Sequence, residues 1–329
     1  TFFVNKLLLA KLIPERVDPH FEALFAIGVD EMSWDDLDDR HYEWPSIQAV
    51  HAYRQKVKAL VLHFIDTQPL QAPINWQHPW WAVMMAIEHE RIHLETSSVL
   101  IRQQQLEYVL SHPQWRPYTQ HAQAPLNSLV SVPPTDVCLY KTHANPFYGW
   151  DNEYGVHKVH VKAFAASRYL VSNQEFLGFV EDDGYTQPQL WSTEGQAWLE
   201  FSQAKHPTFW LASAQGWQLR LMTDVVTMPW NWPVEINFHE AKAFCNWKSK
   251  ITGEKVRLPS EDEWYALYQN THLSPEQIQQ YANLQLNLAA SSCPVDHFIH
   301  GEFYDVQGNV WQWTETPIYP FDGFQVHPL

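Results

Sequence analysis

The chain has 329 residues, of which 45% are hydrophobic and 18% charged, and its formal net charge is −16 with a sequence pI of about 5.5. This length suits two domains, and the hydrophobic content excludes a disordered tail because it supports packed cores. The acidic balance argues against nucleic acid and against an acidic membrane face as partners, because both repel negative charge.

The first third of the chain predicts helices. The first carries an apolar face that ends at Pro14, and the third runs over 79–105. The second begins after the cap residue Ser46 and has an apolar inner face formed by Ile47, Val50, Val57, Val61, Phe64 and Ile65. Helices of this length joined by loops indicate a small helical bundle.

The following segment, about 111–146, is broken by prolines and predicts a linker. From about 147 onward, short strands alternate with turns and aromatic residues. Residues 156–163 alternate like a half-buried strand. Two helices are expected, over 173–182 and over 239–251, and the second ends at Gly253, a typical helix C-cap.

The three cysteines, Cys138, Cys245 and Cys293, form no C-x-x-C pair. They predict neither a disulfide framework nor a cysteine-rich zinc site, and they favour a reducing cytoplasm. The apolar run 6–13 is too short to span a bilayer and lacks a signal-peptide cleavage pattern. Because the chain opens on Thr1 inside an amphipathic helix, without Met or a cap residue, we expect it to be trimmed.

The sequence E-H-E-R-I-H-L-E-T at 88–96 carries the clearest chemical signal. His89 and His93 are four residues apart on a predicted helix, so they share one face and can hold one metal ion. Glu95 lies about 200° around the helix from His93, which assigns it to the second shell or to a structural bond. A third ligand must therefore come from elsewhere.

Two other interpretations of this helix stay open. His89-Glu90-x-x-His93 matches the signature of zinc hydrolases, in which Glu90 would be the general base. The longer metzincin form fails, because Thr96 and Val99 stand where glycine and the third histidine are required. Alternatively, both histidines are core residues of a bundle, although two buried imidazoles without partners are costly.

Further motifs follow in order along the second half. They are Y-L-V-S-N-Q-E-F at 169–176, P-V-E-I-N-F-H-E-A at 233–241, F-C-N-W at 244–247, R-L-P-S-E-D-E-W at 257–264 and G-N-V-W-Q-W at 308–313. Together with F-Y-G-W-D-N-E at 147–153 and the histidine pair, they resemble the non-haem iron sulfoxide synthases of thiohistidine biosynthesis over nearly the whole chain.

The resemblance implies an α+β fold with two domains. Residues 1–112 would form a DinB-like iron-binding helical bundle, 113–146 a linker, and 147–329 a domain like the formylglycine-generating enzyme, a relative of C-type lectins. This last domain would be incomplete at its C-terminal end. Within it, Trp311 and Trp313 are expected to fill the core. Asn309 belongs to a motif that binds a structural calcium in related folds, but Gln312 replaces the usual acidic residue.

Two branches of the family are similar to the chain. The stretches 148–154, 291–296 and 305–316 resemble the ovothiol branch, which makes 5-histidylcysteine sulfoxide from L-histidine and L-cysteine. The ergothioneine branch acts on hercynine and uses arginines after the first helix to hold γ-glutamylcysteine. Here Glu43-Trp44-Pro45 occupies that neighbourhood, which suits cysteine as the smaller donor, although Arg40 remains available.

The resemblance also implies a cofactor, Fe(II), with O2 as co-substrate. His89 and His93 would be two iron ligands, and the third would be a histidine just before Thr1. His63 and His78 are candidates within the chain, but we expect a surface and a capping role for them. Arg91 is expected to face solvent or another domain. A catalytic tyrosine is expected beyond Leu329, and a methyltransferase domain follows in many ovothiol enzymes. Substrate-binding residues remain unknown.

Overall fold

The computed structural model describes residues 1–27 and 42–329. The chain divides into two compact units. Unit 1 comprises Thr1–Glu95, Leu139–His157 and Pro320–Leu329, and unit 2 comprises Thr96–Cys138 and Lys158–Tyr319. Arg40 lies outside the described residues. The two units are defined by contacts within the fold, which do not test domain boundaries drawn by sequence family. The expected domains 1–112, 113–146 and 147–329 therefore remain predictions.

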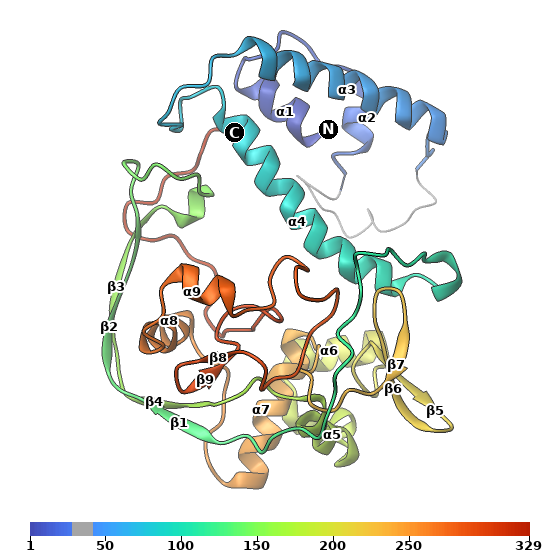
Figure 1. Ribbon diagram of the computed structural model, residues 1–329, viewed down its shortest axis with the longest axis vertical. Helices are drawn as coiled ribbons and strands as arrows, with labels where there is room; N and C mark the ends of the chain where they lie inside the picture. Colours follow the sequence, from blue (N-terminus) through green and yellow to red (C-terminus); the bar gives the residue numbers. More distant parts are fainter. Residues whose placement is uncertain (28–41) are drawn as a thin grey trace. The chain divides into compact units, whose positions relative to one another are not determined.

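Unit 1 is built mainly from helices. It contains α1 (Phe2–Leu9), α2 (Pro19–Leu24), α3 (Ile47–Thr67), the greater part of α4 (Trp81–Gln103) and the short 3-10 helix η4 (Asp151–Glu153). In Figure 1, α1 and α2 lie beside the longer α3. Asp18 and Ser46 begin α2 and α3 as N-caps, since their side chains accept hydrogen bonds from the Phe21 and Ala49 amides. The Ser46 cap confirms the expected start of the second long helix.

The core of unit 1 lies between α1, α3 and α4. Its fully buried members are Val4, Leu7, Ile13, Phe64, Ala82 and Val83. The inner face of α3 differs from the expected one, because Ile47 is 72% exposed and Ile65 is 36% exposed. Tyr53 and Phe64 are the buried residues of this helix. The buried stripe is therefore rotated toward Tyr53, and Ile47, in the first turn, lies outside it.

Within residues 1–27 and 42–329, the strands pair in four small sheets. Their bounds are β1 (Leu129–Val132), β2 (Thr135–Lys141), β3 (Gly155–Val161), β4 (Phe164–Ser167), β5 (Trp210–Ser213), β6 (Gly216–Arg220), β7 (Val225–Thr227), β8 (Ile299–His300) and β9 (Phe303–Tyr304). The pairs are β1 with β4, β2 with β3, and β8 with β9, while β5, β6 and β7 form one antiparallel sheet. In the first pair, Leu129 is opposite Ser167 and Val132 is opposite Phe164.

The remaining helices belong to unit 2. They are α5 (Asn173–Glu181), α6 (Thr193–Ser202), α7 (Phe238–Thr252), α8 (Glu261–Asn270) and α9 (Pro275–Gln280), with the 3-10 helices η3 (Leu106–Tyr108), η5 (Gly184–Thr186) and η6 (Pro188–Leu190). Asn237 and Glu240 form a capping box at the start of α7, and Gly253 ends it with φ 73°. Strand β3 and helices α5 and α7 confirm the elements expected near 156–163, 173–182 and 239–251, and the fold confirms a mixture of helix and sheet.

Unit 2 has an aromatic core. Its largest buried side chains include Phe176, Phe179, Trp210, Trp232 and Phe244. The rings of Phe176 and Phe244 stack with centroids 5.4 Å apart. Such rings bury a large apolar area and fix the packing of α5 and α7 on the sheet formed by β5, β6 and β7.

The expected core role of two other tryptophans is wrong. Trp311 is 74% exposed and Trp313 is 48% exposed. The indole N–H of Trp313 donates to the Ile236 carbonyl at 3.0 Å, and its ring meets the Phe238 ring edge-on with centroids 5.7 Å apart. The buried residue next to this motif is Val306, so the chain turns its aliphatic side chain, not its indoles, toward the core.

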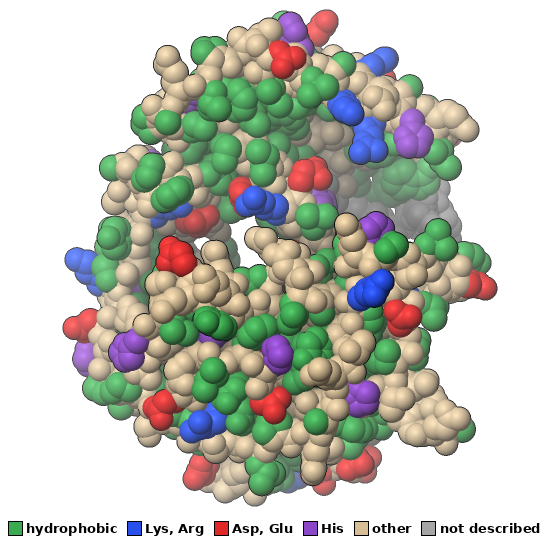
Figure 2. Space-filling model, viewed as in Figure 1, with side chains coloured by type: hydrophobic (Ala, Val, Ile, Leu, Met, Phe, Trp, Pro, Cys, Tyr) green, Lys and Arg blue, Asp and Glu red, His purple; other side chains and the backbone are tan. Residues whose placement is uncertain are grey.

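Two further features bear on the expected organisation. The proline-rich segment 113–146 contains β1 and β2, so part of it is regular structure. No helix among the described residues is long and apolar enough to cross a bilayer. On the face drawn in Figure 2, hydrophobic side chains are scattered among charged and polar ones.

Candidate metal centre

Helix α4 brings the two predicted metal ligands together. The Nε2 atoms of His89 and His93 lie 3.2 Å apart, and their rings are nearly perpendicular, with an interplanar angle of 77°. Two imidazole nitrogens bound side by side at ~2.1 Å from one ion would be roughly 3 Å apart. The spacing predicted from the sequence therefore produces a pair that fits a metal ion taking imidazole ligands, such as iron, zinc or copper.

The environment of His89 favours the neutral form that a metal requires. Burial of the imidazole lowers its pKa below the ordinary value, and the neighbouring His93 lowers it further. The carboxylate of Glu90 acts in the opposite direction but has a smaller effect. A neutral imidazole keeps the nitrogen lone pair available at neutral pH.

The histidine pair opens into a pocket of about 390 Å³ in unit 1. Helix α4 contributes His89, Glu90 and His93 to its lining. The other lining residues come from the start of the chain, from the end of α2 and from α3: Thr1, Phe2, Phe25, Ala26, Val50, Tyr53, Arg54 and Val57. Apolar walls with one guanidinium, one carboxylate and a phenol suit a small polar ligand held in a defined orientation.

Phe2 forms the wall behind His89. Its ring stacks on the imidazole with centroids 3.8 Å apart and an interplanar angle of 1°. The ammonium of Lys6 lies 5.1 Å from the centroid of the same phenyl ring. Parallel contact with a neighbouring ring restricts rotation of the imidazole, so α1 positions a residue of α4.

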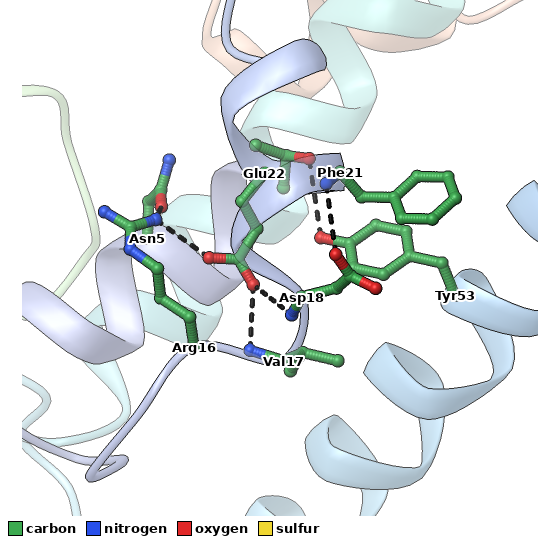
Figure 3. A network of polar contacts seen from close by, with 8 residues as sticks. Asn5, Arg16, Val17, Asp18, Phe21, Glu22 and Tyr53 are labelled. Carbon is green, nitrogen blue, oxygen red and sulfur yellow. Dashed lines mark hydrogen bonds and ion pairs between the residues drawn. The ribbon is translucent and has the colours of Figure 1, made fainter. Parts of the chain in front are cut away.

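A buried network holds the opposite wall in place. The carboxylate of Glu22 accepts hydrogen bonds from the Arg16 guanidinium at 2.8 Å and from the Val17 and Asp18 amides at 2.8 and 3.0 Å (Figure 3). The ring of Phe21, next to it on α2, stacks on Tyr53 with centroids 5.0 Å apart. Glu22 thus fixes the start of α2, and α2 supports the phenol that lines the pocket.

The charged residues of the motif at 88–96 differ in whether they line the pocket. Glu90 lines the pocket, as the zinc-hydrolase interpretation requires. Glu95 is exposed and does not line the pocket, and its expected outer role stays a prediction. Arg91 is 63% exposed and pairs with Glu88 at 2.9 Å, which agrees with the solvent-facing role expected for it.

The two alternative histidines within the chain take the structural roles expected of them. His63 is exposed on α3, and His78 Nδ1 accepts a hydrogen bond from the Trp80 amide just before α4. Neither lines the pocket with His89. Across residues 1–27 and 42–329, no group of three or more His, Cys, Asp or Glu side chains is arranged to hold a metal. The expected third ligand, before Thr1, is outside the sequence and stays a prediction.

Asn309 is occupied by protein contacts. Its amide accepts from the Cys293 N–H at 2.8 Å and donates to the Cys293 carbonyl and to Asp305. Gln312 donates to the Asp305 carbonyl at 2.7 Å. These bonds give the motif at 308–313 a structural function in the protein as described.

Sequence reasoning missed Phe2, Tyr53 and Arg54 as lining residues. For Tyr53 a signal existed, because it lies three residues after Val50 and four before Val57 on the same stripe of α3. Phe2 and Arg54 carry no such signal, since their place beside the histidines depends on how α1, α3 and α4 pack.

Comparisons with known proteins found a matching family model and several similar proteins. The model of the sulfatase-modifying factor enzyme 1-like domain matches residues 116–323. Hercynine oxygenase of Mycolicibacterium smegmatis is 28% identical over 292 residues, covering 83% of this chain and 63% of that protein. Its namesake from Mycolicibacterium thermoresistibile is 27% identical, covering 82% and 59%. The formylglycine-generating enzyme of Bos taurus is 29% identical, covering 50% of the chain and 51% of the enzyme.

These coverages carry two consequences. The first two alignments include more of the chain than the segment 116–323, so part of the similarity lies outside the matched domain. The chain also spans only about 60% of the length of those two relatives.

Proposed function

The chain belongs to the sulfatase-modifying factor enzyme 1-like family, and from this premise we propose that it is part of a non-haem Fe(II)- and O2-dependent sulfoxide synthase. The enzyme would join the sulfur of L-cysteine to the imidazole of L-histidine with oxidation of the sulfur, as in ovothiol biosynthesis. The observation that carries the proposal is the His89–His93 pair, with Nε2 atoms 3.2 Å apart in an open pocket.

The relatives support an oxygenase. Two of them are named hercynine oxygenase, and their similarity covers more than four fifths of the chain. This similarity reaches outside the matched domain, which favours a shared site in the helical part as well. We propose that the helices of residues 1–112 are a DinB-like bundle that carries the metal.

We propose a separate role for each of several residues that line the pocket. His89 and His93 would hold the metal through their Nε2 atoms, and an Fe(II) ion bound there would supply the activation of O2. Phe2 keeps the His89 ring from rotating. Arg54 and Glu90 offer opposite charges to the carboxylate and ammonium groups of one of the two amino-acid substrates. The apolar side chains of Val50 and Val57 exclude water from part of the wall.

Hercynine is the second candidate for the acceptor, since it is named in the relatives themselves. Histidine and hercynine differ at the amino group, which is trimethylated in hercynine. The acceptor is therefore tested by comparing the two compounds directly.

The test uses the purified protein loaded anaerobically with Fe(II). We expect O2 consumption that requires both cysteine and histidine, and a product whose mass equals the joined substrates less two hydrogens plus one oxygen. His93→Ala should abolish metal binding and turnover, whereas His63→Ala, an exposed histidine of α3, should change neither. Turnover with cysteine and hercynine, but not with cysteine and histidine, would support hercynine as the acceptor. Peptide cleavage by a zinc-loaded protein, lost in Glu90→Gln, would overturn the proposal.

A further inference from the structure

A second, smaller pocket lies in unit 1, with a volume of about 80 Å³. Its walls are aromatic: Phe2, Trp81, Tyr148 and Trp150 all line it. The Trp81 and Tyr148 rings lie 4.7 Å apart and the Tyr148 and Trp150 rings 5.7 Å apart. A water needs ~10–15 Å³ of such space, so the pocket has room for a handful of heavy atoms.

Two residues that line this pocket each have a buried polar atom with no hydrogen-bond partner among the described residues. These atoms are the phenol oxygen of Tyr148 and Nε2 of His327. His327 is only 6% exposed. Its Nδ1 accepts from the Leu329 amide at 3.1 Å, which places the ring proton on Nε2. Burial lowers the pKa of this imidazole, and the Trp76 backbone, which lies nearby without meeting the geometry of a hydrogen bond, raises it only in part.

Both atoms can therefore donate a hydrogen bond to a ligand. Leaving a buried donor unsatisfied costs roughly as much as losing a hydrogen bond, so two of them in one small pocket call for an acceptor. Lys6, from α1, adds a charged donor to the lining. Three donors around one space fit a carboxylate.

The same pocket also carries a negative charge. Asp151 lines it, and one of its oxygens accepts from the His327 backbone amide at 3.1 Å, which fixes the carboxylate in place. A carboxylate beside the faces of aromatic rings is a favourable place for an ammonium group. Lys6 and Asp151 thus present opposite charges to one ligand.

We propose that this pocket binds the ammonium–carboxylate head group of a free α-amino acid, with Lys6, Tyr148 and His327 holding the carboxylate and Asp151 the ammonium. The proposal deepens the proposed function, on which it rests for the choice of histidine as the amino acid. Phe2 lines both pockets, so the proposed head-group site and the candidate metal centre share the Phe2 side chain in their walls.

The test measures binding without metal and without turnover. L-Histidine is titrated by calorimetry into the protein stripped of metal with EDTA, and the fluorescence of the neighbouring tryptophans is followed in parallel. We expect saturable binding at one site. Histamine, which lacks the carboxylate, should bind at least about tenfold more weakly, since charged hydrogen bonds would be lost.

Variants locate the site. Tyr148→Phe keeps the ring but removes the hydroxyl, and it should weaken histidine binding about tenfold. Tyr140→Phe is its control, because Tyr140 is 68% exposed in the same unit. Lys6→Met should weaken binding similarly, with the exposed Lys11→Met as its control. Circular dichroism checks that each variant folds. If one of the two test variants does not fold, the other test variant and its control are sufficient.

The two proposals fail separately. Absence of histidine binding to the metal-free protein, or unchanged affinity in both Tyr148→Phe and Lys6→Met, would overturn the head-group site. Equal binding of histamine and histidine would also overturn it, because the carboxylate would then be irrelevant. None of these results depends on O2 consumption, which alone tests the sulfoxide synthase.

Discussion

The phenyl ring of Phe2 lies flat against the imidazole of His89, with ring centroids 3.8 Å apart and planes inclined by 1°. The contact joins the first turn of α1 to the middle of α4. It fixes the plane in which the His89 lone pair points, and it makes the geometry of the histidine pair depend on a residue that carries no metal chemistry itself.

Phe2→Leu should therefore weaken metal binding without removing a ligand. An aromatic contact of this kind is worth ~0.5–1.5 kcal/mol, so we expect roughly a two- to tenfold loss of affinity. The measurement is a titration with Co(II), followed by its visible absorption. Phe147→Leu, which changes a 74% exposed phenylalanine of the same unit, should bind as the unaltered protein does. Equal affinities of the two variants would contradict the role of the stack.

The buried carboxylate of Glu22 should be needed for stability. Its side chain is fully buried and accepts one guanidinium and two backbone hydrogen bonds. Glu22→Ala leaves those amides without an acceptor and should lower the free energy of unfolding by about 1–3 kcal/mol. Glu22→Gln keeps an acceptor oxygen and should cost less.

Urea unfolding followed by fluorescence measures the Glu22 effect. Glu15→Gln, at an exposed position in the same segment, is the matched control and should be neutral. If Glu22→Ala unfolds at the same urea concentration as the Glu15 variant, the network in Figure 3 does not stabilise the protein.

Local signals in the sequence were sufficient for the helices and for the histidine pair. Ser46 caps α3, and Gly253 ends α7 in the left-handed conformation, as their residue types predict. His89 and His93 meet because four residues make about one helical turn, which no tertiary contact has to arrange.

Features that depend on packing between elements could not be predicted in this way. Ile47 is as apolar as any core residue, yet it is 72% exposed because α1 packs further along α3. The indole of Trp311 gives no sign in sequence that it faces outward. Asp305 is fully buried although it carries a carboxyl group, and nothing in its sequence neighbours predicts this. Hydrophobicity predicts that a residue prefers burial, whereas topology decides whether a neighbour covers it.

Arg102, on the last turn of α4, should not tolerate lysine. Its guanidinium lies 3.7 Å from the centroid of the Phe209 ring, donates twice to the Arg220 carbonyl and pairs with Glu235. An ammonium cannot stack and bond in several directions at once. Because the side chain is only 8% exposed, Arg102→Lys should lower the free energy of unfolding by roughly 1–3 kcal/mol.

The matched control for Arg102 is Arg91→Lys, at a 63% exposed position on the same helix. Urea unfolding of the two variants should separate them, with only the Arg102 variant destabilised. Indistinguishable midpoints would mean that the stacked guanidinium contributes no more than an exposed one.

Asp305 should make the stability of the protein fall as pH rises. Burial raises the pKa of its carboxyl group to about 8, although the Asn309 amide lowers it in part. In the unfolded chain the same group ionises near its ordinary value of about 3.9. Between these values the folded protein keeps a proton that the unfolded chain releases. The stabilising contribution is therefore complete below about pH 4 and is lost as pH rises through about 8, by up to ~1.4 kcal/mol per pH unit.

Asp305→Asn tests this directly, because the amide is close in shape to the protonated carboxyl and does not titrate. Urea unfolding at pH 5, 7 and 9 should show that the unaltered protein loses stability with rising pH relative to this variant. Asp66→Asn, at an exposed position on α3, should follow the unaltered protein throughout. Parallel pH profiles for the Asp305 variant and the unaltered protein would mean that the carboxyl group is ionised in the fold. In that case a cation or a water must supply the partner that its Oδ1 atom lacks among the described residues.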